Sequence, residues 1–86
     1  MRLVFDIETD GLLRDLSVIH CIVARDLDTN QEHRFEPHQI KEGLQLLQQA
    51  DELWGHNIIG YDLEAIREIH PEWTTKAKPF DTLILS

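Results

Sequence analysis

The stretch from Arg2 to Glu8, RLVFDIE, predicts a buried β-strand that carries two acids near its end. Its apolar residues are partly β-branched, which is typical of a strand. Residues two apart on a strand point to the same face, so Asp6 and Glu8 are expected about 6–7 Å apart on one side. Two acids so placed repel and desolvate each other unless a cation lies between them or the strand end reaches water. The stretch therefore predicts either a cation site or a hydrated strand end.

In the rest of the sequence, some stretches have apolar residues at the two-residue interval of a strand and others at the interval of a helix. Further strands are predicted at 17–25, 32–35 and 52–55, helices from Pro37 onward and at 61–69, and either a last strand or a new helix at 80–85. The helix after Pro37 rests on Ile40, Leu44 and Leu47, which recur at the helical interval. The resulting order, β-β-β-α-β-α-β, is typical of an α/β fold whose sheet begins with antiparallel strands.

The composition is that of a globular protein with an acidic balance. Eighty-six residues allow one domain at most. Sixteen acids against eight bases give a net charge of −8, which argues against a basic surface that follows a long phosphate track. Sites for divalent cations concentrate carboxylates, so the charge leaves two classes of protein, a metal-dependent phosphate enzyme or an acidic interaction module.

Cysteine usage and hydropathy exclude other classes. Cys21 is the only cysteine, which excludes an internal disulfide and a cysteine zinc cluster. No run approaches the roughly 20 apolar residues that a membrane span requires. Asp6 comes too early in the chain for a signal peptide, so we expect a cytoplasmic protein without a membrane partner.

A second informative stretch lies at residues 55–62, which read GHNIIGYD. It places Asp62 at the first turn of the helix predicted at 61–69. An acid at this position is stabilised by the helix dipole without any further function. Asn57 and Gly60 are common in loops for conformational reasons. Alone, this stretch predicts a loop and a capping acid.

Together, the two stretches resemble the motifs of one family. Asp6-Ile7-Glu8-Thr9 resembles the first motif of the DEDD (DnaQ-like) 3′→5′ exonucleases, and residues 57–62 match the second. Asp81-Thr82-Leu83 resembles the Asp-Thr segment that often follows the second motif. The whole chain is most similar to the N-terminal part of the proofreading domain of phage-type family A DNA polymerases. The resemblance implies a ribonuclease H-like mixed sheet of about five strands with flanking helices.

The resemblance also implies a two-metal site that hydrolyses the 3′ ends of single-stranded DNA. Asp6 would bridge two Mg²⁺ or Mn²⁺ ions, Glu8 would support the ion that holds the attacking water, and Asp62 would hold the other ion through water. These ions prefer oxygen ligands, which agrees with an acid cluster that lacks cysteine.

Four substrate contacts are implied in the same way. Thr9 corresponds to a position whose backbone meets the terminal nucleotide, and Leu12 to the apolar residue that stacks on the last base, with core packing as the alternative for Leu12. Asn57 either holds the substrate or orders its loop, and Tyr61 completes the substrate-binding set.

The sequence departs from the family at the third motif. No Asp with a Tyr or His a few residues before it follows Asp62, and Asp81 has Ala77 four residues earlier. We therefore expect residues 1–86 to form a partial exonuclease domain, with first and second motifs present and the C-terminal helices missing. The isolated chain is expected to be weak or inactive. Its expected partners are the rest of a DNA polymerase or a second copy bound through the exposed face, in the cytoplasm of a bacterium or a phage-infected host.

Two alternatives stay open from the sequence. One is an RNA-trimming exonuclease of the same superfamily, because the motifs do not distinguish the sugars. The other is a non-catalytic acidic interaction module that keeps only the fold.

Two further residue types are assigned to packing. The histidines show no zinc-binding spacing, and His20, inside an apolar strand, is predicted to be a core residue. Trp54 and Trp73 are predicted to pack in the fold rather than to stack on bases.

Overall fold

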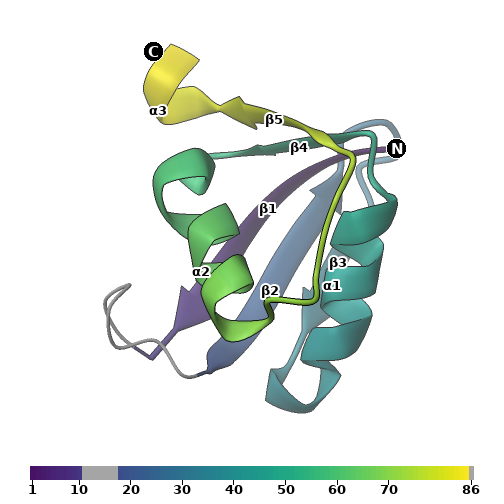
Figure 1. Cartoon of the computed structure of the whole chain (residues 1–86). Helices are drawn as coiled ribbons and strands as arrows, with labels where there is room; N and C mark the ends of the chain where they lie inside the picture. The colour runs from purple at the N-terminus through teal and green to yellow at the C-terminus, as the bar shows by residue number, and fades with distance from the viewer. Residues whose placement is uncertain (11–17, 86) are drawn as a thin grey trace.

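The computed structural model describes residues 1–10 and 18–85, and shows a five-stranded mixed sheet with helices packed on one face (Figure 1). The elements are β1 (Arg2–Thr9), β2 (Ile19–Asp26), β3 (Glu32–Phe35), the 3₁₀ turn η2 (Pro37–Gln39), α1 (Ile40–Gln49), β4 (Glu52–Gly55), the π-helical turn η3 (Ile58–Asp62), α2 (Leu63–Ile69), β5 (Lys78–Asp81) and α3 (Thr82–Leu85). The predicted order of elements is confirmed, and the stretch at 80–85 divides into the end of β5 and the start of α3.

The strands lie in the order β3-β2-β1-β4-β5, so β1 is the central strand. It pairs antiparallel with β2 and parallel with β4, and β4 pairs parallel with β5. The antiparallel start and the parallel continuation agree with the sequence prediction. The α/β fold with a ribonuclease H-like mixed sheet is thereby confirmed.

The core lies between the sheet and the two longer helices. Leu3, Phe5 and Ile7 alternate along β1 and are at most 5% exposed, as the two-residue period of a strand requires. Helices α1 and α2 cover this face with the apolar stripes that the sequence predicted (Figure 1). Trp73 closes the core as predicted, because its indole N–H donates to the carbonyl oxygen of Leu44 at 2.9 Å.

The prediction that His20 is a core residue is wrong, because a β-bulge turns this side chain into solvent. Glu8 pairs with Cys21, but the next residue of β1, Thr9, pairs with Ile19. The extra residue is His20, which is exposed, while Ile19 is fully buried. A bulge inserts one residue into a strand and re-aims the side chains that follow. It lies directly opposite the end of β1 that carries the two acids.

An irregular turn directly precedes the second predicted helix. The sequence predicted a helix over 61–69, but α2 begins at Leu63, after the π-helical turn Ile58–Asp62. Asn57 precedes this turn with φ of 59°, a left-handed conformation that Asn adopts more readily than most residues. Short π-helical turns are rare and often occur at functional sites.

No helix in residues 1–10 and 18–85 is long and apolar enough to cross a membrane.

Candidate active site

The candidate site lies where β1 continues beyond its parallel neighbour. β1 pairs with β4 only as far as Val4, which lies opposite Trp54, and β4 ends at Gly55. Gly55 leaves little space at this point, because an added Cβ would lie 2.9 Å from the Phe5 carbonyl oxygen and 2.4 Å from Cγ2 of Ile58. The turn η3 is therefore packed directly against the second half of β1.

Asp6 and Glu8 lie on the face of β1 away from the core. Both side chains are exposed, whereas Phe5 and Ile7 between and beside them are buried. The prediction that the two acids share one face is confirmed by this alternation. Their exposure also agrees with the alternative of a hydrated strand end, so their position alone does not assign a function.

Of the three predicted catalytic acids, Asp62 alone lies inside the protein. It is 4% exposed, and its Oδ2 has no hydrogen-bond partner. Its side chain makes no capping hydrogen bond to α2, so the interpretation as a simple helix cap is not supported. Burial, and then the negative charge of Asp6, raise the pKa of Asp62 to about 7, although a hydrogen bond from the Ile7 backbone amide opposes this.

The negative charge of Asp6 acts on Asp62 across the junction of β1 and η3, since it is one cause of the raised pKa of Asp62. Within the described residues, however, no group of three or more His, Cys, Asp or Glu side chains is arranged to hold one ion. Mg²⁺ often keeps several water ligands and binds proteins through one or two carboxylates together with substrate phosphates. A hydrated ion bound through one or two carboxylates is thus compatible with the absence of such a group, and the predicted metal ligands Asp6, Glu8 and Asp62 stay a prediction.

Thr9 and Tyr61 are brought together at the end of β1. Their hydroxyl oxygens lie 2.6 Å apart, which is a hydrogen bond between residues 52 positions apart in the sequence. Both side chains are half-buried. The bond ties β1 to η3 next to Asp62, so these two predicted substrate-binding residues border the carboxylates.

We expect Tyr61→Phe and Thr9→Val to show an energetic coupling. Both residues make further interactions, so single changes mix several effects, whereas a double-mutant cycle isolates the pair. The coupling expected from a neutral hydrogen bond is about 1 kcal/mol, measured by urea unfolding of the four proteins. Additive effects within about 0.3 kcal/mol would show that the two hydroxyls do not support each other.

Asn57 is placed in a way that favours its loop-ordering role. Its backbone adopts the left-handed conformation, and its Oδ1 lies only 2.7 Å from where a Cβ on Gly60 would be. The exposed side chain therefore lies over the turn that leads to Asp62. Its predicted contact with substrate stays a prediction. Leu12, the predicted base-stacking residue, lies outside the described residues.

Asp81 is a buried acid whose role the sequence reasoning missed. It is 3% exposed and accepts three backbone amides, from Asn57 at 2.8 Å, Ile59 at 2.9 Å and Leu83 at 2.9 Å. Burial by itself would raise the pKa of Asp81, but the three amides and His56 outweigh it and hold that pKa below its ordinary value. The available indication was an acid at the end of an apolar strand, directly before Thr82.

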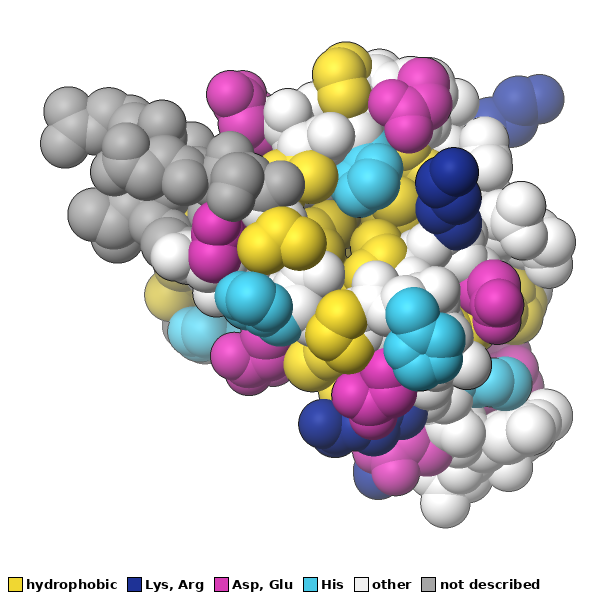
Figure 2. All heavy atoms as spheres, turned by 90° about the horizontal axis from the view of Figure 1, so that it is seen from below, with side chains coloured by type: hydrophobic (Ala, Val, Ile, Leu, Met, Phe, Trp, Pro, Cys, Tyr) yellow, Lys and Arg dark blue, Asp and Glu magenta, His cyan; other side chains and the backbone are white. Residues whose placement is uncertain are grey.

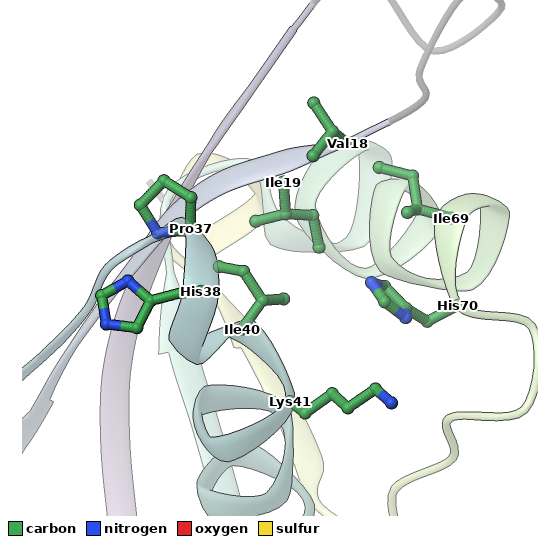
Figure 3. Close-up of a pocket in the computed structure, with 8 residues that line it drawn as sticks. All are labelled: Val18, Ile19, Pro37, His38, Ile40, Lys41, Ile69 and His70. Carbon is green, nitrogen blue, oxygen red and sulfur yellow. The ribbon is translucent and has the colours of Figure 1, made fainter.

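A separate hollow lies at the end of the molecule where α1 begins and α2 ends. Figure 2 shows hydrophobic side chains gathered on this face with histidines around them, and acids and bases nearby. The hollow measures about 600 Å³ and has apolar walls from β2, α1 and α2, with His38, Lys41 and His70 among its lining residues (Figure 3). None of the predicted site residues that the structure describes lines it, so it is distinct from the carboxylates on β1 and η3.

No family model matches the chain, and no curated protein matches it. Among solved structures, the chain is similar to the family B DNA polymerase from the hyperthermophilic archaeon Pyrobaculum calidifontis, with a TM-score of 0.72 and 15% identity. The match covers 95% of this chain and 15% of that polymerase chain. At this identity the likeness shows the fold alone. The likeness does not support the more specific resemblance to the exonuclease domains of family A polymerases, which stays a prediction.

Proposed function

We propose that Asp6, Glu8 and Asp62 form part of a two-metal 3′→5′ exonuclease site that hydrolyses single-stranded DNA at its 3′ end, in the proofreading unit of a DNA polymerase. The observation that carries this proposal is the Asp62 carboxylate, buried beside Asp6 with Oδ2 unpaired. The fold, similar to part of a DNA polymerase, supports it.

A bound cation is the simplest physical reason for such a carboxylate. A buried polar atom without a partner costs about 1–3 kcal/mol, and more when it is charged. The negative charge of Asp6 increases this cost, because it further disfavours the ionised form of Asp62. A divalent cation would remove the repulsion and supply the missing partner of Oδ2. In this proposal the buried Asp62 carboxylate lowers the stability of the metal-free protein and raises its affinity for a cation.

The chain's own residues would divide the work as follows. Asp6 and Asp62 would hold metal from β1 and η3, and Glu8 would add a carboxylate on the exposed face. Bound ions of this kind activate water and stabilise the leaving oxygen of a phosphodiester. Thr9 and Tyr61 border the carboxylates and would meet the terminal nucleotide. In this proposal residues 1–86 are a partial exonuclease domain, and a further carboxylate comes from another segment of the polymerase or from a partner.

Metal binding is tested by Mn²⁺ calorimetry on the wild type, Asp6→Ala and Glu64→Gln. Glu64 is the matched control, because it is an exposed acid of α2 that pairs with Arg67. We expect the wild type and Glu64→Gln to bind Mn²⁺ alike, and Asp6→Ala to bind at least about tenfold more weakly, since it removes a ligand. No binding by the wild type at millimolar Mn²⁺ would favour the non-catalytic interaction module.

Activity is tested with 3′-labelled single-stranded DNA and RNA in the presence of Mn²⁺. We expect weak trimming of DNA that is lost in Asp6→Ala. Trimming that survives Asp6→Ala would refute the mechanism. A clear preference for RNA would instead support the RNA-trimming alternative, because the 2′-hydroxyl is what distinguishes the two substrates.

A further inference from the structure

Both carboxylate oxygens of Asp81 accept hydrogen bonds from backbone amides. Oδ1 accepts the amides of Asn57 and Leu83, and Oδ2 accepts the amide of Ile59. Asp62 differs in this respect, because its Oδ2 accepts nothing. Two acids among the described residues are buried. Both carboxylate oxygens of Asp81 have hydrogen-bond partners, whereas Oδ2 of Asp62 has none.

The hydrogen bonds of Asp81 connect the end of β5 to the loop and turn that lead to Asp62. Asp81 ends β5 opposite Gly55, the last residue of β4. Two of its three amide donors belong to the loop and turn that lead from β4 to Asp62. This path includes the left-handed residue Asn57, a conformation that costs about 1 kcal/mol or more for a residue with a side chain. The hydrogen bonds to Asp81 hold the path in that conformation.

Thr82 reinforces the same loop. Its hydroxyl lies 3.1 Å from Nδ1 of His56 and donates a longer bond, of 3.4 Å, to the carbonyl oxygen of Gly55. Asp81 and Thr82 together thus bind four of the five residues on the path from Gly55 to Ile59, all except Ile58. The other end of that path carries Asp62, which is buried where η3 packs against β1 and accepts a hydrogen bond from the Ile7 amide.

We propose that Asp81 is a positioning residue, which binds no metal itself but fixes the loop and turn so that Asp62 is held beside Asp6. The inference rests on the proposed function for the role of Asp62. It goes beyond that function by assigning the Asp81-Thr82 segment of β5 and α3 to the site. Both oxygens of Asp81 are occupied by amides, so coordination of an ion would require breaking the bonds that shape the loop.

The test uses ¹⁵N-labelled wild type, Asp81→Asn and Asp26→Asn, with two readouts. One is the NMR shift and hydrogen exchange of the Ile7 amide, which reports on the placement of Asp62 without metal. The other is the Mn²⁺ dissociation constant. Asp26 is the matched control, because its Oδ1 also accepts two backbone amides, of Asp28 at 2.8 Å and Thr29 at 3.1 Å, but in the distant β2–β3 turn.

In Asp81→Asn we expect the Ile7 amide to shift and exchange faster, and Mn²⁺ to bind about tenfold more weakly. Asp26→Asn should leave both values unchanged. A folded Asp81→Asn with a wild-type Ile7 amide overturns the inference, whether Mn²⁺ still binds or not, because a loss of binding without movement of Asp62 would make Asp81 a ligand.

Two other outcomes of this experiment are the absence of Mn²⁺ binding by the wild type and the failure of Asp81→Asn to fold. If the wild type binds no Mn²⁺, the proposed function fails, while the Ile7 amide still decides whether Asp81 positions Asp62. If Asp81→Asn does not fold, Thr82→Val replaces it, because this change keeps the shape of the side chain and removes only its hydrogen bonds. We expect a smaller change of the same kind in Thr82→Val, and an unchanged Ile7 amide there would overturn the inference.

Discussion

Asp62→Asn is expected to raise the stability of the metal-free protein at pH 8 and to abolish its stabilisation by Mn²⁺. The substitution keeps the size of a side chain that is 4% exposed but removes the charge that burial and Asp6 disfavour. The expected gain at pH 8 is about 1–3 kcal/mol, and each kcal/mol corresponds to roughly 4–8 °C in Tm for a domain of this size. Mn²⁺ should raise the Tm of the wild type by mass action and leave Asp62→Asn unchanged.

The pH dependence follows from the pKa of Asp62, which is 3.8 ordinarily and about 7 in the folded protein. Between these values the folded state holds a proton that the unfolded state has released, so the free energy of unfolding falls as pH rises from about 4 to about 7. Asp81 acts in the opposite sense, but its pKa is held below the ordinary value, so its contribution is lost only at lower pH. The difference between wild type and Asp62→Asn should therefore grow from pH 5 to pH 8.

The measurement is thermal unfolding of wild type, Asp62→Asn and Glu64→Gln from pH 5 to pH 8, with chelator and then with Mn²⁺. Glu64 belongs to the same helix but is exposed, so its removal should give a small effect that does not change over this range. A constant difference between wild type and Asp62→Asn would contradict the burial of an ionisable Asp62. An equal response of the two proteins to Mn²⁺ would remove Asp62 from the metal site.

Gly55→Ala is expected to destabilise the fold by about 2–4 kcal/mol and to weaken Mn²⁺ binding. The new Cβ would lie 2.4 Å from Cγ2 of Ile58 and 2.9 Å from the carbonyl oxygen of Phe5. The Phe5 oxygen belongs to the central strand, so relief requires that β1 and β4 separate or that η3 moves away. Either movement displaces Asp62 from Asp6.

Gly60→Ala is the matched control for this prediction. There the new Cβ would meet only the amide end of Asn57, at 2.7 Å, which rotates away at low cost because the side chain is exposed. We expect a change within about 1 kcal/mol, since the glycine has no positive φ and alanine lowers the entropy of the unfolded chain. Urea unfolding and Mn²⁺ calorimetry of both variants check the pair. Equal destabilisation would show that the contact between β4 and β1 is not the constraint described.

The fold was predictable because burial imposes periods on the sequence. The alternation of Leu3, Phe5 and Ile7 identified the central strand and assigned Asp6 and Glu8 to its other face. The stripe of Ile40, Leu44 and Leu47 identified α1 in the same way. His20 escaped this reasoning, because a bulge depends on how two strands pair and leaves no mark in the period of one strand.

The candidate site was predictable only in part. Its residues were chosen through motifs, and the sequence allowed Asp62 to be a simple helix cap. The structure distinguishes the two roles, because a capping acid bonds its own helix, whereas Asp62 faces Ile7 and Asp6. The sequence places Asp81 in a segment that resembles the Asp-Thr segment after the second motif, but it does not reveal the three amide partners, because two of them lie in a loop and turn whose shape no local pattern encodes.

The sequence by itself thus determined the strands, the helices, the acidic balance and the shared face of Asp6 and Glu8. These properties depend on neighbours within a few positions, for which the backbone period is sufficient. Only the tertiary structure decided that Asp62 is buried and that Asp81 accepts amides from the loop and turn that lead to Asp62. Those facts depend on contacts between residues about 20 to 55 positions apart, and burial, hydrogen bonding and pKa take their values only when such segments meet.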